Sequence, residues 1–251
     1  KYNLFIDNSA GTSLDKTSEG KKILSLAKLI SSNFKISNCL EILKSGNSYS
    51  HNNPSDIEHL EVHLIRKNNI LYLSEIFEKY SAQLKDSLGN AALLTQLQAL
   101  NDVALGLSSQ SKIPLLCKQL SGLANIVFIN EFLEDSNYQK IMEQLLKLSK
   151  AAPNTTIHID NFAELLQLNL GNITIWPRQN LNEKAAILSP VEARLQHFDS
   201  VIMADVNLES WPAGKFSPWF SRNMLKSMNF NLEDDIISLS AHDFASHMHA
   251  R

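Results

Sequence analysis

Short β-rich runs lie near the two ends of this 251-residue chain, and helical periodicity fills the long stretch between them. The runs are Leu4–Ile6 at the start and Ile173–Trp176, Ala185–Leu188 and Val201–Met203 in the last third. From about residue 17 to 170, apolar residues recur at helical spacing between polar and proline-containing breaks. Because runs so far apart can form a sheet only if the chain ends meet, the sequence predicts one α/β domain interrupted by a helical insertion.

Local signals refine this picture at both ends of the chain. We expect the first run to lead into a turn over Asp7–Gly11, whose Asn, Ser and Gly residues suit tight turns. A helix is expected to begin at Thr17 or Ser18, either of which can act as its N-cap. Further along, Pro190–Gln196 predicts a helical turn that starts on proline. Val201–Asp205 then predicts a short buried strand that ends on a carboxylate.

Composition and charge narrow the class of protein. The net charge of −3 argues against a self-sufficient nucleic-acid binder, so any such contact has to be local or shared with other parts of the protein. Cys39 and Cys117 are far apart and lack a CxxC partner, which predicts a reducing, cytoplasmic setting without a disulfide or zinc site. No apolar run is long enough for a membrane helix. Since the chain starts at Lys1 and stops at Arg251 inside a helical pattern, we interpret it as an internal fragment.

Eight phrases, in a fixed order, carry a resemblance to a known family. They are Ile6–Gly11, Thr17–Lys21, Pro190–Gln196, Val201–Met203, Asn207, Trp211–Pro212, Pro218–Arg222 and Ala241–Phe244. Together they resemble AddB, the inactivated superfamily 1 helicase-like subunit of the bacterial AddAB helicase–nuclease, in its alphaproteobacterial form. The resemblance covers the two ends of the chain and leaves its middle aside.

The resemblance implies a specific architecture and role. Residues 1–16 with 171–251 would form a RecA-like second motor domain, of the P-loop NTPase helicase type, with a partial parallel sheet (2A-like). Residues 17–170 would form its large α-helical insertion (2B-like). The implied function is a non-catalytic module in DNA double-strand break repair by recombination. It would guide double-strand ends and single strands and dock the AddA-type helicase–nuclease subunit. No cofactor is expected in this fragment, and ATP or an iron–sulfur cluster would be bound elsewhere in the parent.

Two other functions stay open on the sequence. The chain has no G-x-x-x-x-G-K-[ST] phosphate loop, so half of an ATP-hydrolysing DNA helicase motor would need that loop elsewhere in the parent. A helical protein-interaction scaffold without a nucleic-acid role fits the acidic balance. The fragment itself is expected to catalyse nothing, whereas its parent would belong to an ATP-dependent helicase–nuclease complex.

Glu192, Arg194 and Gln196 are the first candidate site residues. By resemblance they lie on the DNA or nucleotide side of the motor, at a helix start, where unpaired N–H groups and the helix dipole attract phosphates. The alternative is an internal pair between Glu192 and Arg194 that holds this helix to a strand. Both interpretations remain open on the sequence.

Trp211, Trp219 and Arg222 form the second candidate group. Tryptophans beside prolines can make a platform on which single-stranded bases stack, or a packed aromatic corner. His59 and His63, four residues apart, could offer two metal ligands but are expected to be a solvated helix face. His242 with Asp243 is expected to cap the last helix. No metal site is predicted.

Overall fold

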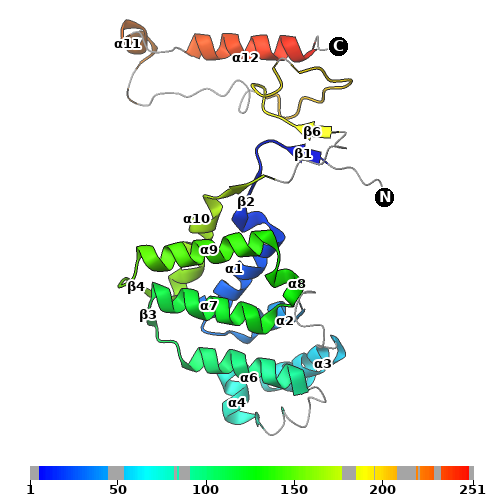
Figure 1. Ribbon diagram of the computed structural model, residues 1–251, viewed down its shortest axis with the longest axis vertical. Coiled ribbons are helices and arrows are strands. Elements are labelled where there is room, and N and C mark those ends of the chain that lie inside the picture. Colours follow the sequence, from blue (N-terminus) through cyan, green and yellow to red (C-terminus); the bar gives the residue numbers. More distant parts are fainter. Residues whose placement is uncertain are drawn as a thin grey trace. The chain divides into compact units, whose positions relative to one another are not determined.

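The computed structural model describes residues 6–44, 54–81, 84, 91–176, 185–194, 196–207, 219, 221–228 and 233–248. This part of the chain is rich in helix and contains three two-stranded sheets, so the helix-rich α/β class expected from the sequence is observed (Figure 1). None of the described helices combines the length and the apolar character that a membrane span requires.

The chain divides into two compact units. Unit 1 comprises residues 1–11 and 176–251, and unit 2 comprises residues 12–175. The boundaries lie earlier on the first side and later on the second than those predicted at 16/17 and 170/171. The reason is that β2 (Thr12–Ser13) and β5 (Thr174–Ile175) pair antiparallel, with Thr12 opposite Ile175, and this pair closes the helical unit.

Unit 2 consists mainly of helices. Its elements are η1 (Leu14–Lys16), α1 (Ser18–Ser31), α2 (Ile36–Lys44), α3 (Pro54–His59), the π-helix η2 (Leu60–Arg66), α4 (Leu73–Lys79), α6 (Ala91–Leu105), β3 (Gln110–Lys112), α7 (Ile113–Val127), α8 (Asn130–Leu133), α9 (Ser136–Ala151), β4 (Thr156–His158), η3 (Ile159–Asn161) and α10 (Phe162–Gly171).

The start of α1 follows the signal in the sequence. The Gly20 amide donates a hydrogen bond to Thr17 Oγ1 at 3.0 Å, so Thr17 is the N-cap that was predicted. The same hydroxyl donates to the Leu14 carbonyl oxygen at 2.7 Å. This ties the first turn of α1 to η1, and Leu14 is fully buried there.

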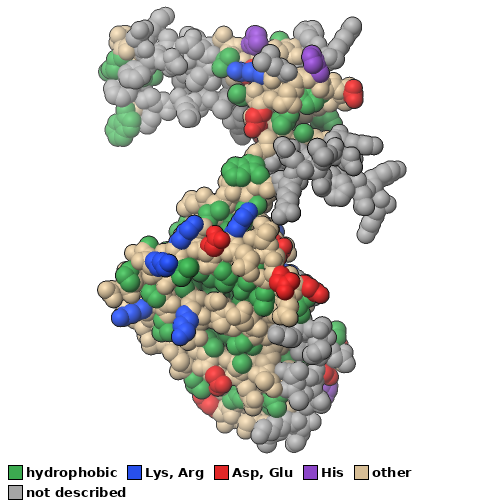
Figure 2. Space-filling view, viewed as in Figure 1, with side chains coloured by type: hydrophobic (Ala, Val, Ile, Leu, Met, Phe, Trp, Pro, Cys, Tyr) green, Lys and Arg blue, Asp and Glu red, His purple; other side chains and the backbone are tan. Residues whose placement is uncertain are grey.

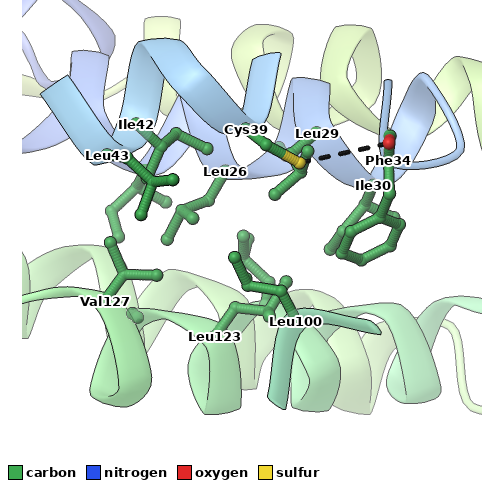
Figure 3. Packing of buried hydrophobic residues seen from close by; sticks show 14 of the residues in the cluster. Leu26, Leu29, Ile30, Phe34, Cys39, Ile42, Leu43, Leu100, Leu123 and Val127 are labelled. Atoms are coloured by element: carbon green, nitrogen blue, oxygen red, sulfur yellow. Dashed lines mark hydrogen bonds between the residues drawn. The ribbon is translucent and has the colours of Figure 1, made fainter. Parts of the chain in front are cut away.

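The apolar core of the described residues lies entirely in unit 2, between Leu14 and Leu170. Figure 3 shows how it forms: Leu26 and Leu29 of α1 face Leu123 of α7 across a layer of interdigitated side chains. α7 and α9 pack against each other, and α1 packs on α10 (Figure 1). Burial of this many aliphatic side chains is the main source of stability in a unit of this size.

The structure also contains an antiparallel pair of strands that the periodicity did not predict. β3 and β4 pair antiparallel, with Ser111 opposite Ile157, inside the stretch that was expected to be helical throughout. Gln110–Lys112 is polar, so it carries no apolar alternation from which a strand could be predicted. This strand pair brings the start of α7 close to the end of α9, because β3 directly precedes α7 and β4 follows α9.

Unit 1 contains a parallel pair of strands from the two ends of the chain. β1 (Ile6–Asn8) lies beside β6 (Ala185–Ile187), with Ile6 opposite Ala185 and Asn8 opposite Ile187. Parallel strands cannot be joined by a tight turn and need a long crossover, which here contains all of unit 2. The expected meeting of the chain ends is therefore observed. The helices of unit 1 in the described part are α11 (Arg222–Ser227) and α12 (Glu233–Met248).

Two sequence predictions about this sheet are wrong. Val201–Asp205 is not a buried strand: it has no strand pairing, and the Ile202 side chain is 91% exposed. A β-rich run becomes a strand only where a neighbouring backbone can pair with it, and composition does not supply one. In addition, Ile173–Trp176 contributes β5 to unit 2, antiparallel to β2, and not a strand to the sheet of unit 1.

Candidate functional site

The candidate site begins where the two parallel strands of unit 1 end. The Ser9 amide donates to the Ile187 carbonyl oxygen at 3.1 Å, one residue beyond β1. The chain then leaves β6 and makes one helical turn, in which the Ala193 amide donates to the Ser189 carbonyl oxygen at 3.0 Å. This is the proline-started turn that the sequence predicted, and it lies at the carboxyl ends of both strands.

Glu192 is bonded to the segment that follows β1 and to the segment that follows β6. Its Oε2 atom accepts hydrogen bonds from the Ser9 hydroxyl at 2.6 Å and from the Ser189 amide at 2.9 Å. The Glu192 amide donates to Ser189 Oγ at 3.3 Å, which completes a capping box. The bond from Ser9, followed by those from Ser189, lowers the pKa of the Glu192 carboxyl below its usual range. These bonds thus favour the charged form of the carboxylate.

Sequence reasoning missed Ser189 and Ser9, although a signal for the first was present. Ser189-Pro190-Val191-Glu192 has the S-x-x-E order of a capping box, with proline at the first helical position. The contact of Ser9 with Glu192 spans 183 positions, and no local pattern encodes it.

Arg194 is paired with Asp243 and not with Glu192. Its Nε and Nη2 atoms donate to the two carboxylate oxygens of Asp243 at 2.7 and 2.8 Å. The Asp243 side chain is 6% exposed, and its hydrogen bonds raise the pKa of Arg194 above the ordinary value. Because the fork of the guanidinium is occupied, Arg194 serves this contact before any phosphate. The Glu192–Arg194 pair, which the sequence left open as an alternative, is not observed: each residue bonds a different partner.

Asp243 also corrects the predicted end of the chain. His242 and Asp243 lie inside α12, which begins at Glu233, so they do not cap its start. His242 is exposed, and its Nδ1 atom lies 4.0 Å from Asp243 Oδ1. The role of Asp243 is to tie α12 to the turn at Arg194.

Gln196 completes the first candidate group without an outward contact in this structure. Its Nε2 atom donates to the Glu192 carbonyl oxygen at 2.8 Å. Glu192, Arg194 and Gln196 therefore lie on one turn, as predicted, and each is engaged within unit 1. What the turn offers to a ligand is the anionic Glu192 carboxylate, which can accept bonds from hydroxyl groups.

The second candidate group is only partly visible. Trp219 is 84% exposed, so the packed aromatic corner does not hold for this residue. Arg222 begins α11, and Trp211 lies outside the described residues. Trp176 is a further exposed tryptophan, but its indole Nε1 donates to the Ser9 carbonyl oxygen at 3.1 Å.

No cluster of three metal-ligating side chains exists among the described residues. The His59 and His63 rings stand 4.4 Å apart, centroid to centroid, on an exposed helix face. Glu61 between them is engaged by Lys44 and Arg66. In the part of the chain that the structure describes, the two histidines thus remain a pair of ligands without a third.

Comparison with known proteins places the chain beside one distant relative of unassigned role. An uncharacterized protein of Rickettsia bellii (strain RML369-C) is 22% identical over 238 residues, which make up 93% of this chain and 27% of that protein. The chain thus spans about a quarter of the length of the relative it matches. No family model matches the chain, and no solved structure matches it. The likeness includes residues of both units, because it extends over nearly the whole chain.

Proposed function

We propose that this chain is a non-catalytic, helicase-like module of a DNA double-strand break repair subunit of the AddB type. In this role it guides DNA and docks an AddA-type helicase–nuclease subunit in the cytoplasm. The observation that carries the proposal is the parallel pairing of β1 with β6 around a helical insertion. The second motor domain of superfamily 1 helicases, which the sequence resembles, has this organisation.

The contacts within unit 1 lend further support. Three of the phrases that carry the resemblance contact one another: Ser9 from the first bonds Glu192 from the third, and Arg194 of the third bonds Asp243 from the last. Such contacts give a physical reason for these residues to occur together in one sequence. We infer a RecA-like sheet that extends the β1–β6 pair with strands from other parts of the parent protein.

The guiding role does not require ATP hydrolysis in this chain. The sequence has no phosphate loop. The charged Glu192 at the strand ends suits a hydroxyl group of a nucleotide better than a phosphate, which it would repel. We therefore propose a supporting function, in which the partner subunit supplies the motor.

The decisive experiment is reconstitution of the complete parent protein with its AddA-type partner. We expect the two to elute together and to bind a blunt DNA end more tightly than either does alone, measured by fluorescence anisotropy. Failure to form the complex, together with no affinity for DNA ends, would overturn the proposal. Complex formation without DNA affinity would favour the second candidate, a helical interaction scaffold, which the net charge of −3 supports.

Trp219 provides a sharper test of single-strand contact. Its exposed indole can stack on a base, and Trp219→Ala should then weaken single-strand binding by about 1–3 kcal/mol. Trp176→Ala is the matched control, because that exposed indole is held by Ser9. Equal effects of the two substitutions would argue against stacking on Trp219.

A further inference from the structure

Five lysines gather on one face of unit 2. They are Lys112 of β3, Lys118 of α7, and Lys140, Lys147 and Lys150 of α9, and all five are exposed. Figure 2 shows basic side chains over α9, the start of α7 and the neighbouring β3–β4 strand pair. None of the five forms an ion pair within the described part of the chain. We call this set the lysine face.

The spacing of the α9 lysines forms a row. Lys140 and Lys147 are seven residues apart, which places them on the same side of the helix, about 10 Å apart along its axis. Lys150 is three residues further and therefore a neighbour of Lys147. Glu143 is the one acidic residue in the sequence of α9. In a chain with a net charge of −3, this face thus carries a local positive excess.

Nothing in the packing of unit 2 requires this arrangement. α9 is held in place by Tyr138, Ile141 and Leu145, which are buried on its opposite side. Lysines at neighbouring positions of a helix repel one another by a few tenths of a kcal/mol. Arg194, Lys44 and Arg66 show the other solution in this chain, since each is paired with a carboxylate. An external anion would relieve the repulsion along this row.

We propose that the lysine face binds the phosphate backbone of nucleic acid, independently of its sequence. The inference rests on the proposed DNA-guiding role and gives that role a surface, which the occupied Arg194 does not provide. Lysines are point charges that attract phosphates but lack the planar fork that reads base edges. An anionic membrane is a poorer fit, because the apolar side of α9 is buried and cannot enter lipid.

The test compares two charge-matched variants of the purified protein. Lys140→Gln/Lys147→Gln/Lys150→Gln removes the row, and Lys28→Gln/Lys35→Gln/Lys67→Gln removes three exposed lysines elsewhere in unit 2. The probe is a labelled duplex or single strand of about 30 nucleotides at about 50–200 mM salt. We expect the first variant to lose about tenfold or more in affinity, with a log–log salt slope shallower by about 2 to 3, and the control to change little.

A substitution of opposite sign guards against a trivial loss of folding. Glu143→Gln removes the acidic residue from the row and should tighten binding about twofold or more. Circular dichroism of all variants should match that of the wild type. Equal losses in the two triple variants, or no gain with Glu143→Gln, would overturn the inference.

The other polyanions are separate outcomes. If polyglutamate or vesicles of anionic lipid bind the lysine face more tightly than DNA does, the face belongs to another partner and the inference fails. If the protein binds DNA and the triple variant binds equally well, the inference fails while the proposed function stands. If the parent joins the AddA-type subunit but the protein binds no DNA even at low salt, both the lysine face and the guiding role fail.

Discussion

Gly20, in the first turn of α1, lies directly against the backbone of η1. A Cβ atom at this position would lie 2.0 Å from the Leu14 carbonyl oxygen and 2.9 Å from the Leu14 carbonyl carbon. Both are backbone atoms, which cannot swing aside. Gly122, in the middle of α7, has nothing within 4 Å of the corresponding position. The two glycines therefore differ in what they contribute, although both lie in helices.

We predict opposite effects of alanine at these two positions. Gly20→Ala should lower the free energy of unfolding by about 1–3 kcal/mol, because η1 has to move away from α1. Gly122→Ala should raise it by about 0.5–1 kcal/mol, because alanine is the better helix former and has room. Urea denaturation of the two variants checks both signs, and a loss of stability in Gly122→Ala would contradict the structural account.

At the scale of elements, the Arg194–Asp243 pair is the described connection between the turn after β6 and α12. Both carboxylate oxygens accept, at 2.7 and 2.8 Å, and the bidentate geometry fixes the direction of the helix as well as its distance. Asp243 is buried, in contrast to the other residues of unit 1 for which the structure describes side-chain exposure. An uncompensated arginine or aspartate here would have to find water or another partner.

We predict that Asp243→Ala releases α12. Hydrogen–deuterium exchange should become faster over 233–248 while exchange in unit 2 stays unchanged. Arg194→Lys should give an intermediate result, because lysine keeps the charge and loses the two-pronged geometry. Asp199→Ala is the control, because this exposed carboxylate forms no ion pair with the residues that the structure describes. Slow exchange of α12 in Asp243→Ala would show that other contacts hold it.

Glu61 links two further elements, α2 and the π-helix η2. It accepts from Lys44 at the end of α2 and from Arg66, whose Nη2 lies 2.6 Å from Glu61 Oε1. The hydrogen bonds from Lys44 and then Arg66 lower the pKa of the Glu61 carboxyl below its ordinary value. Since the folded state favours the charged form, the contact stabilises the fold at neutral pH and loses this effect as the pH falls through the lowered pKa.

The resulting pH dependence can be measured. Glu61→Gln should melt at a lower temperature than the wild type at neutral pH, and the difference should shrink as the pH falls through the lowered pKa of the wild-type carboxyl, where that carboxyl becomes protonated. Glu58→Gln should leave the melting temperature nearly unchanged, because Glu58 is exposed and forms no ion pair within the described part of the chain. A difference between Glu61→Gln and the wild type that is constant down to strongly acidic pH would contradict the assignment.

At the scale of the whole molecule, the buried apolar core of the described residues is confined to unit 2. Cys39 and Cys117 are part of it, and burial raises the pKa of Cys39 to about 12 and that of Cys117 to about 11. A buried thiol with so high a pKa is unreactive at neutral pH. Both cysteines therefore report on the integrity of the same core.

We predict that residues 12–175 fold without the rest of the chain. The isolated unit should unfold cooperatively, and both thiols should resist a thiol reagent at pH about 8 until denaturant opens the core. The 251-residue chain should show the same protection. Rapid labelling of both thiols in residues 12–175, with protection in the full chain, would mean that unit 1 is needed for the core.

The sequence predicted what is encoded locally and missed what depends on distant partners. The helix at Ser18 followed from its cap and its periodic apolar face, and the structure shows both. The polar strand Gln110–Lys112 has no such signal. Val201–Asp205 has the composition of a strand but pairs with no strand in the part of the chain that the structure describes.

The candidate site shows the same division. Its turn at Glu192 was predicted from proline and spacing, and Ser189 could have been, from the S-x-x-E order. The partners Ser9 and Asp243 lie 183 and 49 positions away along the chain from Glu192 and Arg194. No periodicity reaches that far, so only the folded structure identifies them.

The short antiparallel ladder between Thr12–Ser13 and Thr174–Ile175 brings the first and last residues of the helical unit side by side. Since the Cα atoms of paired antiparallel residues are about 5 Å apart, a few residues of turn would suffice to splice Gly11 to Trp176. Helices could therefore be added to the helical unit or lost from it during evolution without a change in the distance between the two segments that flank it. The same junction is a natural place to replace the helical unit with another domain.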